Sequence, residues 1–274
     1  MTKFQILDDS LKINKISKTI GKKPIIRDIS LYLQKGEIVG LLGPNGAGKT
    51  TTFYIIVGLI KPDSGSILID KTDVSDLPIY LRSQMGISYL PQEASIFRGM
   101  NVEDNIMSII EVKEPNKNKH QIILENLLVE FDIAHVRKSK SIVLSGGERR
   151  RLEIARTLAS KPNYLLLDEP LTGIDPVSIE EIKIIIKKLK QRNIGVLITD
   201  HNVRETLKIV DRVYIVIEGA IYFDGKQIQL TVSIGFACFD EKFDRYEKWV
   251  EAADKALYHS KENGRNKVTA YTDL

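Results

Sequence analysis

The chain has 274 residues, of which 43% are hydrophobic and 28% charged, the composition of a globular protein. Its net charge of +4 is small beside 40 basic and 36 acidic residues, so charge alone does not indicate a nucleic-acid partner. Cys238 is the single cysteine, which excludes an intrachain disulfide and fits a reducing compartment. Residues 1–12 lack a signal-peptide core, and no apolar run is long enough to cross a bilayer. We therefore expect any membrane contact to be made through a partner.

Strand and helix patterns alternate along most of the chain. Short apolar runs broken by Gly21, Pro24 and Gly36 predict strands and turns over residues 11–42. Strands that alternate with helices predict an α/β fold, a mostly parallel sheet with helices on both faces. In chain order the patterns predict a strand at 38–42, a helix at 49–59, strands at 66–70 and 86–90, a helical insertion at 100–161 with a polar loop at 111–119, a strand at 164–167, a helix at 177–192, a strand at 195–199, a helix at 202–209 and a hairpin at 212–223.

A phosphate-binding loop follows the first buried strand. Residues 43–50 read G-P-N-G-A-G-K-T, the spacing of the phosphate loop of nucleotide-binding proteins. Glycines let backbone N–H groups approach phosphate oxygens, and the following helix adds its positive dipole end. Lys49 supplies a charge for the β- and γ-phosphates, and the Thr50 hydroxyl is placed to ligate Mg²⁺. The expected nucleotide contacts are Gly43, Pro44, Asn45, Gly46, Ala47, Gly48, Lys49, Thr50 and Thr51.

Two adjacent acids end a second buried strand. Residues 164–169 read Y-L-L-L-D-E, and ligands of such sheets bind at the C-terminal ends of the strands. We expect Asp168 to hold Mg²⁺ through water and Glu169 to polarise a water towards the γ-phosphate.

A second glycine-rich motif, L-S-G-G-E at residues 144–148, precedes a helix predicted at 149–160. Ser145 can cap that helix, and Gly146 and Gly147 leave N–H groups open to an anion. Because residues 43–50 already hold one set of phosphates, we expect the second motif to face the nucleotide of a second copy of the chain.

The motifs together resemble the ATP-binding subunit of ABC transporters over residues 10–225. The resemblance includes Gln92 after one strand, L-T-G-I-D at 171–175 and His201 after another strand. Three segments are especially similar to ATPases of lipopolysaccharide export systems, whereas branched-chain amino-acid transporter ATPases are the nearest alternative. These segments are Y-L-P-Q-E-A-S-I-F-R at 89–98, L-S-G-G-E-R-R-R-L-E-I-A-R at 144–156 and L-I-T-D-H-N-V-R-E-T-L at 197–207.

The resemblance implies a P-loop NTPase of the ABC ATPase fold, with an antiparallel β subdomain and a helical subdomain at about 91–161. It implies a homodimer around two ATP·Mg²⁺, driving transmembrane permease subunits from the cytoplasmic face of the inner membrane. In that arrangement Gln92 would sense Mg²⁺ and the attacking water, and Asp175 would reach across the dimer. His201 would hold the γ-phosphate and orient Glu169.

Two further expectations follow from the resemblance. Residues 94–100 would line a groove for a helix of the permease, although Ile96, Phe97 and Met100 fit a small hydrophobic core equally well. The family usually stacks an aromatic residue on adenine at the position of Ile20, so base stacking is lost here.

A non-transport ABC ATPase acting on nucleic acid is another alternative. The basic residues at 149–151 and 183–190 fall on predicted helix faces without stacking aromatics, so we expect solvated faces and no nucleic-acid partner.

Beyond about residue 226 the chain changes character. A strand is predicted at 230–239 and a helix at 246–263. The segments T-V-S-I-G-F-A, A-D-K-A-L-Y and K-E-N-G-R-N resemble the last strand and helix of a diguanylate cyclase (GGDEF) domain. The resemblance implies phosphate contacts for Lys261 and Arg265, but the family's metal-binding strand and glycine-rich acidic turn are absent. We expect a partial domain over 227–274 without cyclase activity. Its predicted strand would have no sheet of its own to join. The alternative is a fragment that binds guanine nucleotide without catalysis.

Overall fold

The computed structural model describes residues 9–225, 234–236, 252, 254–256, 258, 259, 262, 263 and 268–270. The chain divides into two compact units, Met1–Lys226 and Gln227–Leu274. None of the helices in the described ranges has both the length and the apolar character needed to span a bilayer.

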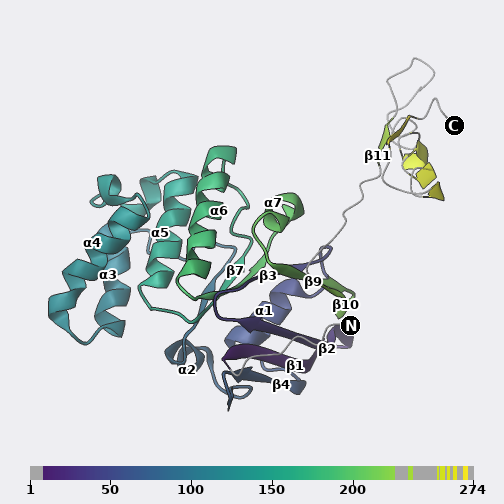
Figure 1. The fold of residues 1–274 in the computed structure, drawn as a ribbon, viewed down its shortest axis with the longest axis horizontal. Coiled ribbons are helices and arrows are strands. Elements are labelled where there is room, and N and C mark those ends of the chain that lie inside the picture. The colour runs from purple at the N-terminus through teal and green to yellow at the C-terminus, as the bar shows by residue number, and fades with distance from the viewer. Residues whose placement is uncertain are drawn as a thin grey trace. The chain divides into compact units, whose positions relative to one another are not determined.

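A six-stranded sheet forms the centre of the larger unit, in the order β10-β9-β3-β8-β7-β6 (Figure 1). Neighbouring strands from β6 to β9 are parallel, and β10 pairs antiparallel with β9 at one edge. Strands β3, β7 and β8 are buried along their whole length, as expected for continuous apolar runs covered on both faces. The strands are β3 (Ile38–Leu42), β6 (Ile87–Leu90), β7 (Tyr164–Asp168), β8 (Gly195–Thr199), β9 (Arg212–Ile217) and β10 (Ala220–Gly225).

A second, antiparallel sheet has the order β2-β1-β4-β5, which confirms the β subdomain. Helix α1 (Lys49–Val57) lies between the two sheets (Figure 1). One hydrophobic cluster joins Phe53 of α1 to Ile29 of the antiparallel sheet and Leu166 of the central sheet. The strands are β1 (Ser10–Ile20), β2 (Lys23–Gln34), β4 (Ser64–Ile69) and β5 (Thr72–Asp73).

The other face of the central sheet packs against helices. Leu165 and Leu167 belong to a second cluster with Ile106 and Leu152. Because side chains alternate along a strand, Leu166 and the next even residue, Asp168, point to the α1 side. The remaining helices are α2 (Ile79–Gln84), α3 (Val102–Lys113), α4 (His120–Glu130), α5 (Gly146–Leu158), α6 (Pro176–Gln191) and α7 (Val203–Leu207), with 3₁₀ turns η1 (Lys117–Lys119), η2 (Ala134–Val136) and η3 (Ser141–Val143).

The predicted helices and strands of this unit are present, with four differences. Strand β5 was not predicted, because two residues are too few to show a pattern. Helix α2 was not predicted, because six residues are too few for a helical period to show. Helix α3 continues through Lys113, where we expected a loop from 111. Helix α5 begins at Gly146 rather than at 149, because Ser145 and Glu148 cap it.

In the C-terminal unit, β11 (Ile234–Phe236) pairs in parallel with β12 (Val268–Ala270). The expectation that the strand lacks a partner was therefore wrong, because a three-residue strand after residue 264 is too short to recognise from its pattern. Helical residues lie between the two strands, and Ala252 and Ala256 are buried. The rest of the predicted strand and helix, including Lys261 and Arg265, lies outside the described residues.

Candidate active site

The phosphate loop joins β3 to α1 as predicted. Gly48 precedes α1 with a φ of 101°, and no side chain caps the helix. A helix start without a cap leaves backbone N–H groups free for an anion. Lys49 is 8% exposed, and its Nζ donates to the carbonyl oxygens of Gly43 at 2.7 Å and Pro44 at 2.9 Å. Burial lowers the pKa of Lys49, and the nearby Glu169 and Asp168 act in the opposite direction.

The turn of the β9–β10 hairpin braces this loop. The Gly219 N–H donates to Ala47 O at 3.1 Å, and Gly219 O accepts from Arg27 N at 2.7 Å. A Cβ at Gly43 would lie 2.2 Å from Val216 O, so no other residue fits there without displacing β9. The loop is held from outside at Ala47 O, and within the loop the Ala47 N–H donates to Pro44 O at 3.2 Å.

Asp168 ends β7 with a carboxylate that is only 1% exposed. Its Oδ2 accepts a hydrogen bond from the Tyr89 hydroxyl at 3.1 Å, while its Oδ1 is buried without a hydrogen-bond partner. Burial raises the pKa of Asp168. Such an orphaned oxygen is costly unless a cation or a water meets it.

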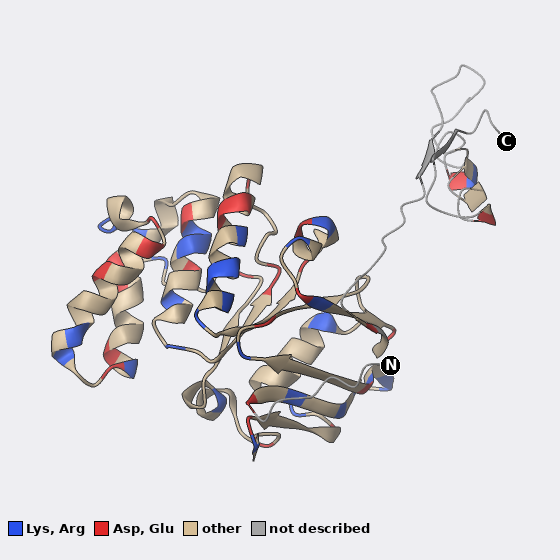
Figure 2. Ribbon diagram, viewed as in Figure 1, with Lys and Arg blue, Asp and Glu red and all other residues tan. Residues whose placement is uncertain are grey.

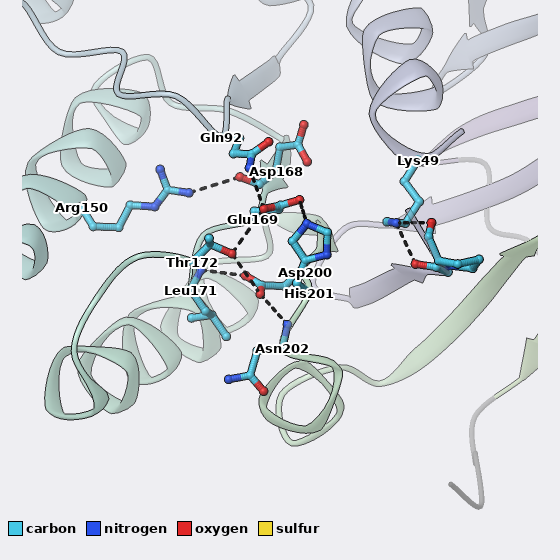
Figure 3. Close-up of polar contacts among 12 residues, drawn as sticks. Lys49, Gln92, Arg150, Asp168, Glu169, Leu171, Thr172, Asp200, His201 and Asn202 are labelled. Atoms are coloured by element: carbon cyan, nitrogen blue, oxygen red, sulfur yellow. Dashed lines mark hydrogen bonds and ion pairs between the residues drawn. The ribbon is translucent and has the colours of Figure 1, made fainter. Parts of the chain in front are cut away.

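Glu169 follows in a left-handed conformation, with a φ of 49°, and is held between two other predicted catalytic residues (Figure 3). The Gln92 Nε2 donates to Glu169 Oε2 at 2.8 Å, and His201 Nε2 lies 2.6 Å from Glu169 Oε1. Thr172 Oγ1 donates to Oε2 at 3.3 Å. The structure therefore brings together Gln92, Glu169 and His201, whose segments are far apart in the sequence.

Two buried charged residues hold the loops of this cluster. Asp200 is 2% exposed and accepts from the backbone N–H groups of Leu171 at 2.8 Å and Asn202 at 2.9 Å. It thereby joins the loop after Glu169 to the loop that carries His201. The guanidinium of Arg150 donates to the carbonyl oxygens of Pro170 at 3.2 Å and Asp168 at 3.3 Å.

Sequence reasoning missed Tyr89, Arg150, Thr172 and Asp200. Tyr89, Arg150 and Asp200 act through contacts that only the fold brings close. Thr172 instead donates to Glu169, three residues before it in the same loop. The sequence offered one sign of their roles, because Asp200 directly precedes His201 and Thr172 lies within the L-T-G-I-D motif.

The L-S-G-G-E motif lies at the start of α5. Ser145 Oγ accepts from Glu148 N at 3.2 Å, and the Glu148 carboxylate accepts from Ser145 N at 2.9 Å, a reciprocal capping box. Ser145 and Gly146 are exposed, whereas a Cβ at Gly147 would lie 2.3 Å from Ser178 Oγ. Ser145 and Gly146 are therefore accessible at the surface, while the capping box already occupies the Ser145 hydroxyl and the Glu148 N–H.

Two predicted contacts lie apart from the Glu169 cluster. Asp175 is exposed and caps α6, its Oδ1 accepting from Val177 N and Ser178 N at 3.1 and 3.0 Å. Ile20 ends β1 and is 53% exposed. In the described part of the chain, no hydrogen bond joins Ser145 or Asp175 to the Glu169 cluster.

Comparisons with known proteins identify the family. The family profile "ABC transporter" matches residues 26–172. A probable ABC transporter ATP-binding protein of Azorhizobium caulinodans is 54% identical over 226 residues, which cover 82% of this chain and 80% of that protein. The chain belongs to the ABC transporter family. It is an ABC ATPase, the ATP-binding subunit of an ABC transporter.

Two relatives of this ABC ATPase are named lipopolysaccharide export system ATP-binding protein LptB. The Haemophilus influenzae protein is 50% identical over 223 residues, covering 80% of this chain and 92% of that protein. The Escherichia coli K12 protein is 48% identical over 222 residues, covering 81% and 92%.

Solved structures show the same fold. The ADP conformation of MJ1267, an ATP-binding cassette of an ABC transporter, has a TM-score of 0.71 at 26% identity, covering 79% of this chain and 91% of that one. The dimeric ATP-binding cassette MJ0796, bound to ADP and Pi, has a TM-score of 0.71 at 23% identity and covers 80% of this chain and all of its own.

A second profile, "Diguanylate cyclase, GGDEF domain", matches residues 181–267. Its first half overlaps the ABC ATPase, because β8 lies between β3 and β7 in the central sheet. Residues 181–225 are therefore part of the ATPase fold, and the match beyond them falls in the C-terminal unit.

The expected Mg²⁺ ligands of this ABC ATPase suit a hard cation. Asp168 Oδ1 is buried and unpaired, and Thr50 is partly exposed at the start of α1. Among the described residues, no group of three or more His, Cys, Asp or Glu side chains is arranged to hold a metal. A site with few protein ligands matches Mg²⁺, which usually keeps waters and binds substrate phosphates.

Proposed function

We propose that this ABC ATPase powers the export of lipopolysaccharide or another lipid through transmembrane permease subunits of the inner membrane. The observation that carries ATP hydrolysis is the placement of Glu169 between Gln92 and His201, at the strand end beside the phosphate loop. The lipid substrate is supported by the two LptB relatives, which match over 92% of their length.

The residues have separate tasks in this proposal. The phosphate loop and Lys49 bind the β- and γ-phosphates, and Lys49 must leave its two carbonyl partners to do so. Glu169 polarises the attacking water, while His201 and Gln92 hold its carboxylate in position. Thr50, Gln92 and Asp168 would hold Mg²⁺, which would supply positive charge to offset that of the phosphates.

We also propose that two copies form a head-to-tail dimer around two ATP molecules. Ser145 and Gly146 are exposed and can contact the nucleotide of a second copy. Asp175, a few residues after Glu169, is also exposed and can reach across the dimer. The MJ0796 cassette, which has this fold, is dimeric.

A groove between α1, α2, β6, α3 and α5 is the proposed docking site of the permease. It has a volume of about 260 Å³. Of residues 94–100, which were expected there, Ser95 lines the groove. Phe97 and Met100 are exposed, at 47% and 37%, but do not line it, and Ile96 is 7% exposed and belongs to the core. Arg156, which lines the groove, lies over the Phe97 ring at 4.3 Å.

Purification of the full chain from membranes of its source organism tests the proposed partners. We expect transmembrane subunits of a lipid exporter to co-purify, and Phe97→Ala to lose them. The matched control is Val129→Ala, which removes another exposed apolar side chain, on α4. Co-purification with an amino-acid importer, or loss of partners in both variants, would contradict the proposal.

For the C-terminal unit, residues 227–274, we propose a partial GGDEF-like domain without cyclase activity. The full chain should make no cyclic di-GMP from GTP. Heat on titration with GTP, while the ATP site is saturated, would instead support a guanine-nucleotide site.

A further inference from the structure

Tyr89 contacts the elements that carry Thr50 and Asp168, two of the three expected Mg²⁺ ligands; the third, Gln92, follows Tyr89's own strand. It lies on β6, beside Leu166 of β7. Its ring makes edge-to-face contacts with two residues of α1, Phe53 at a centroid distance of 6.4 Å and Tyr54 at 6.2 Å. These residues lie about one helical turn after Thr50, so the ring is fixed against the helix that begins at the phosphate loop.

The other end of the side chain holds Asp168. The Tyr89 hydroxyl donates to Asp168 Oδ2 at 3.1 Å, which leaves Oδ1 as the unpaired oxygen. A carboxylate at a strand end can rotate, and this hydrogen bond selects which oxygen is free. The hydroxyl remains protonated, since burial raises the pKa of Tyr89.

We propose that Tyr89 is a positioning residue for Mg²⁺, because it sets the Asp168 carboxylate at a fixed distance from Thr50 on α1. The inference rests on the proposed Mg²⁺·ATP site. It assigns Tyr89 no contact with the metal or the nucleotide.

A second tyrosine provides a matched comparison. Tyr164 lies on β7 beside Ile87 of β6, is fully buried, and donates to Asp70 Oδ1 at 2.7 Å. Burial raises the pKa of Tyr164 as well. It starts β7, whereas Asp168 ends it, so its hydrogen bond stabilises the fold without touching the site.

The experiment compares Tyr89→Phe with Tyr164→Phe in the full chain. Each change removes one hydroxyl whose hydrogen bond to an aspartate is partly buried. The first measurement is Mn²⁺ affinity in the presence of saturating ADP, followed by electron paramagnetic resonance. The second is ADP affinity without metal, in EDTA, and the third is the melting temperature.

We expect Tyr89→Phe to weaken Mn²⁺ binding about tenfold, the loss of roughly one hydrogen bond to a charged group. Metal-free ADP affinity should stay within about twofold. Tyr164→Phe should lower the melting temperature while leaving both affinities unchanged.

Unchanged Mn²⁺ affinity in Tyr89→Phe, or an equal loss in both variants, would overturn the inference. An equal loss of metal-free ADP affinity would also overturn it, since it would indicate general damage to the site. If the unmodified chain binds ADP but no Mn²⁺, the proposed Mg²⁺ site itself fails, and the inference fails with it.

Discussion

Two helices of the ATPase unit, residues 9–225, begin at glycine-rich loops, and they differ in what occupies the helix start. Helix α1 follows Gly48, has no side-chain cap and has no acidic residue in its first turn. Helix α5 follows Ser145 and is closed by the reciprocal hydrogen bonds between Ser145 and Glu148. Figure 2 shows charged residues of both signs along the helices beside this second start.

The difference teaches that a glycine-rich motif does not by itself give an open anion site. The N–H groups of α1 need an external partner, which the phosphates of the proposed nucleotide would supply. At α5 a phosphate must compete with the Glu148 carboxylate for Ser145. The hydrogen bonds from Ser145 hold the pKa of Glu148 below its usual range, so the competing group is charged at neutral pH.

The largest expected effect is that of Glu169→Gln, which should leave ATP bound at the starts of α1 and, in the proposed dimer, of α5. Loss of the group that polarises water should lower ATP hydrolysis by about 10³-fold, within the range for general bases. Nucleotide binding should persist, so ATP should trap a dimer in size-exclusion chromatography. Hydrolysis at the normal rate would contradict the role of Glu169.

Adding Lys49→Ala to that variant should remove ATP from the uncapped start of α1. Loss of the Lys49 charge should weaken ATP binding about 100-fold, as expected for two lost charged hydrogen bonds. The trapped dimer should disappear, and calorimetry should show the weaker binding. Lys187→Ala, which removes an exposed lysine on α6, is the control and should bind normally.

Ser145→Ala in the Glu169→Gln variant should remove the side-chain cap at the start of α5. Losing the cap should cost about 1 kcal/mol of unfolding free energy. ATP affinity of the single chain should be unchanged, yet the ATP-trapped dimer should not form. The control is Asn101→Ala, because Asn101 caps α3 by accepting from Asp104 N at 2.8 Å. A dimer that persists without Ser145 would show that α5 takes no part in it.

The smallest effect is the pH dependence of the capping box. A depressed pKa in the folded state means that Glu148 stabilises the fold above its unfolded pKa of about 4.3. This stabilisation is lost as the pH falls through the folded pKa. Glu148→Gln should therefore lower the unfolding free energy by less than about 1 kcal/mol at pH 7, and denaturation curves of the two proteins should converge towards pH 3. A constant difference would assign the effect to packing.

Sequence alone predicted the parts of the fold that depend on local pattern. Strands β3, β7 and β8 are short apolar runs, and α6 (Pro176–Gln191) matches the helix predicted at 177–192. The strand order and the whole of α2 were not predictable, since neither leaves a periodic signal.

The same limit applies to the site. Gln92, Glu169 and His201 were recognisable because each stands in a motif after a strand. Tyr89 and Asp200 act by contacts across the fold, to Asp168 and to Leu171 N, which no spacing in the sequence encodes.

The β9–β10 hairpin has a consequence for what can follow the ATPase. The phosphate loop accepts a hydrogen bond from Gly219 N, and Gly219 O in turn accepts from Arg27 N; both residues precede β10. Strand β10 is the edge strand of the central sheet, and it ends at Gly225. A segment that follows Gly225 is thus attached to an edge strand of the central sheet. In the part of the chain that the structure describes, the hydrogen bonds that hold the phosphate loop therefore involve no residue beyond Gly225.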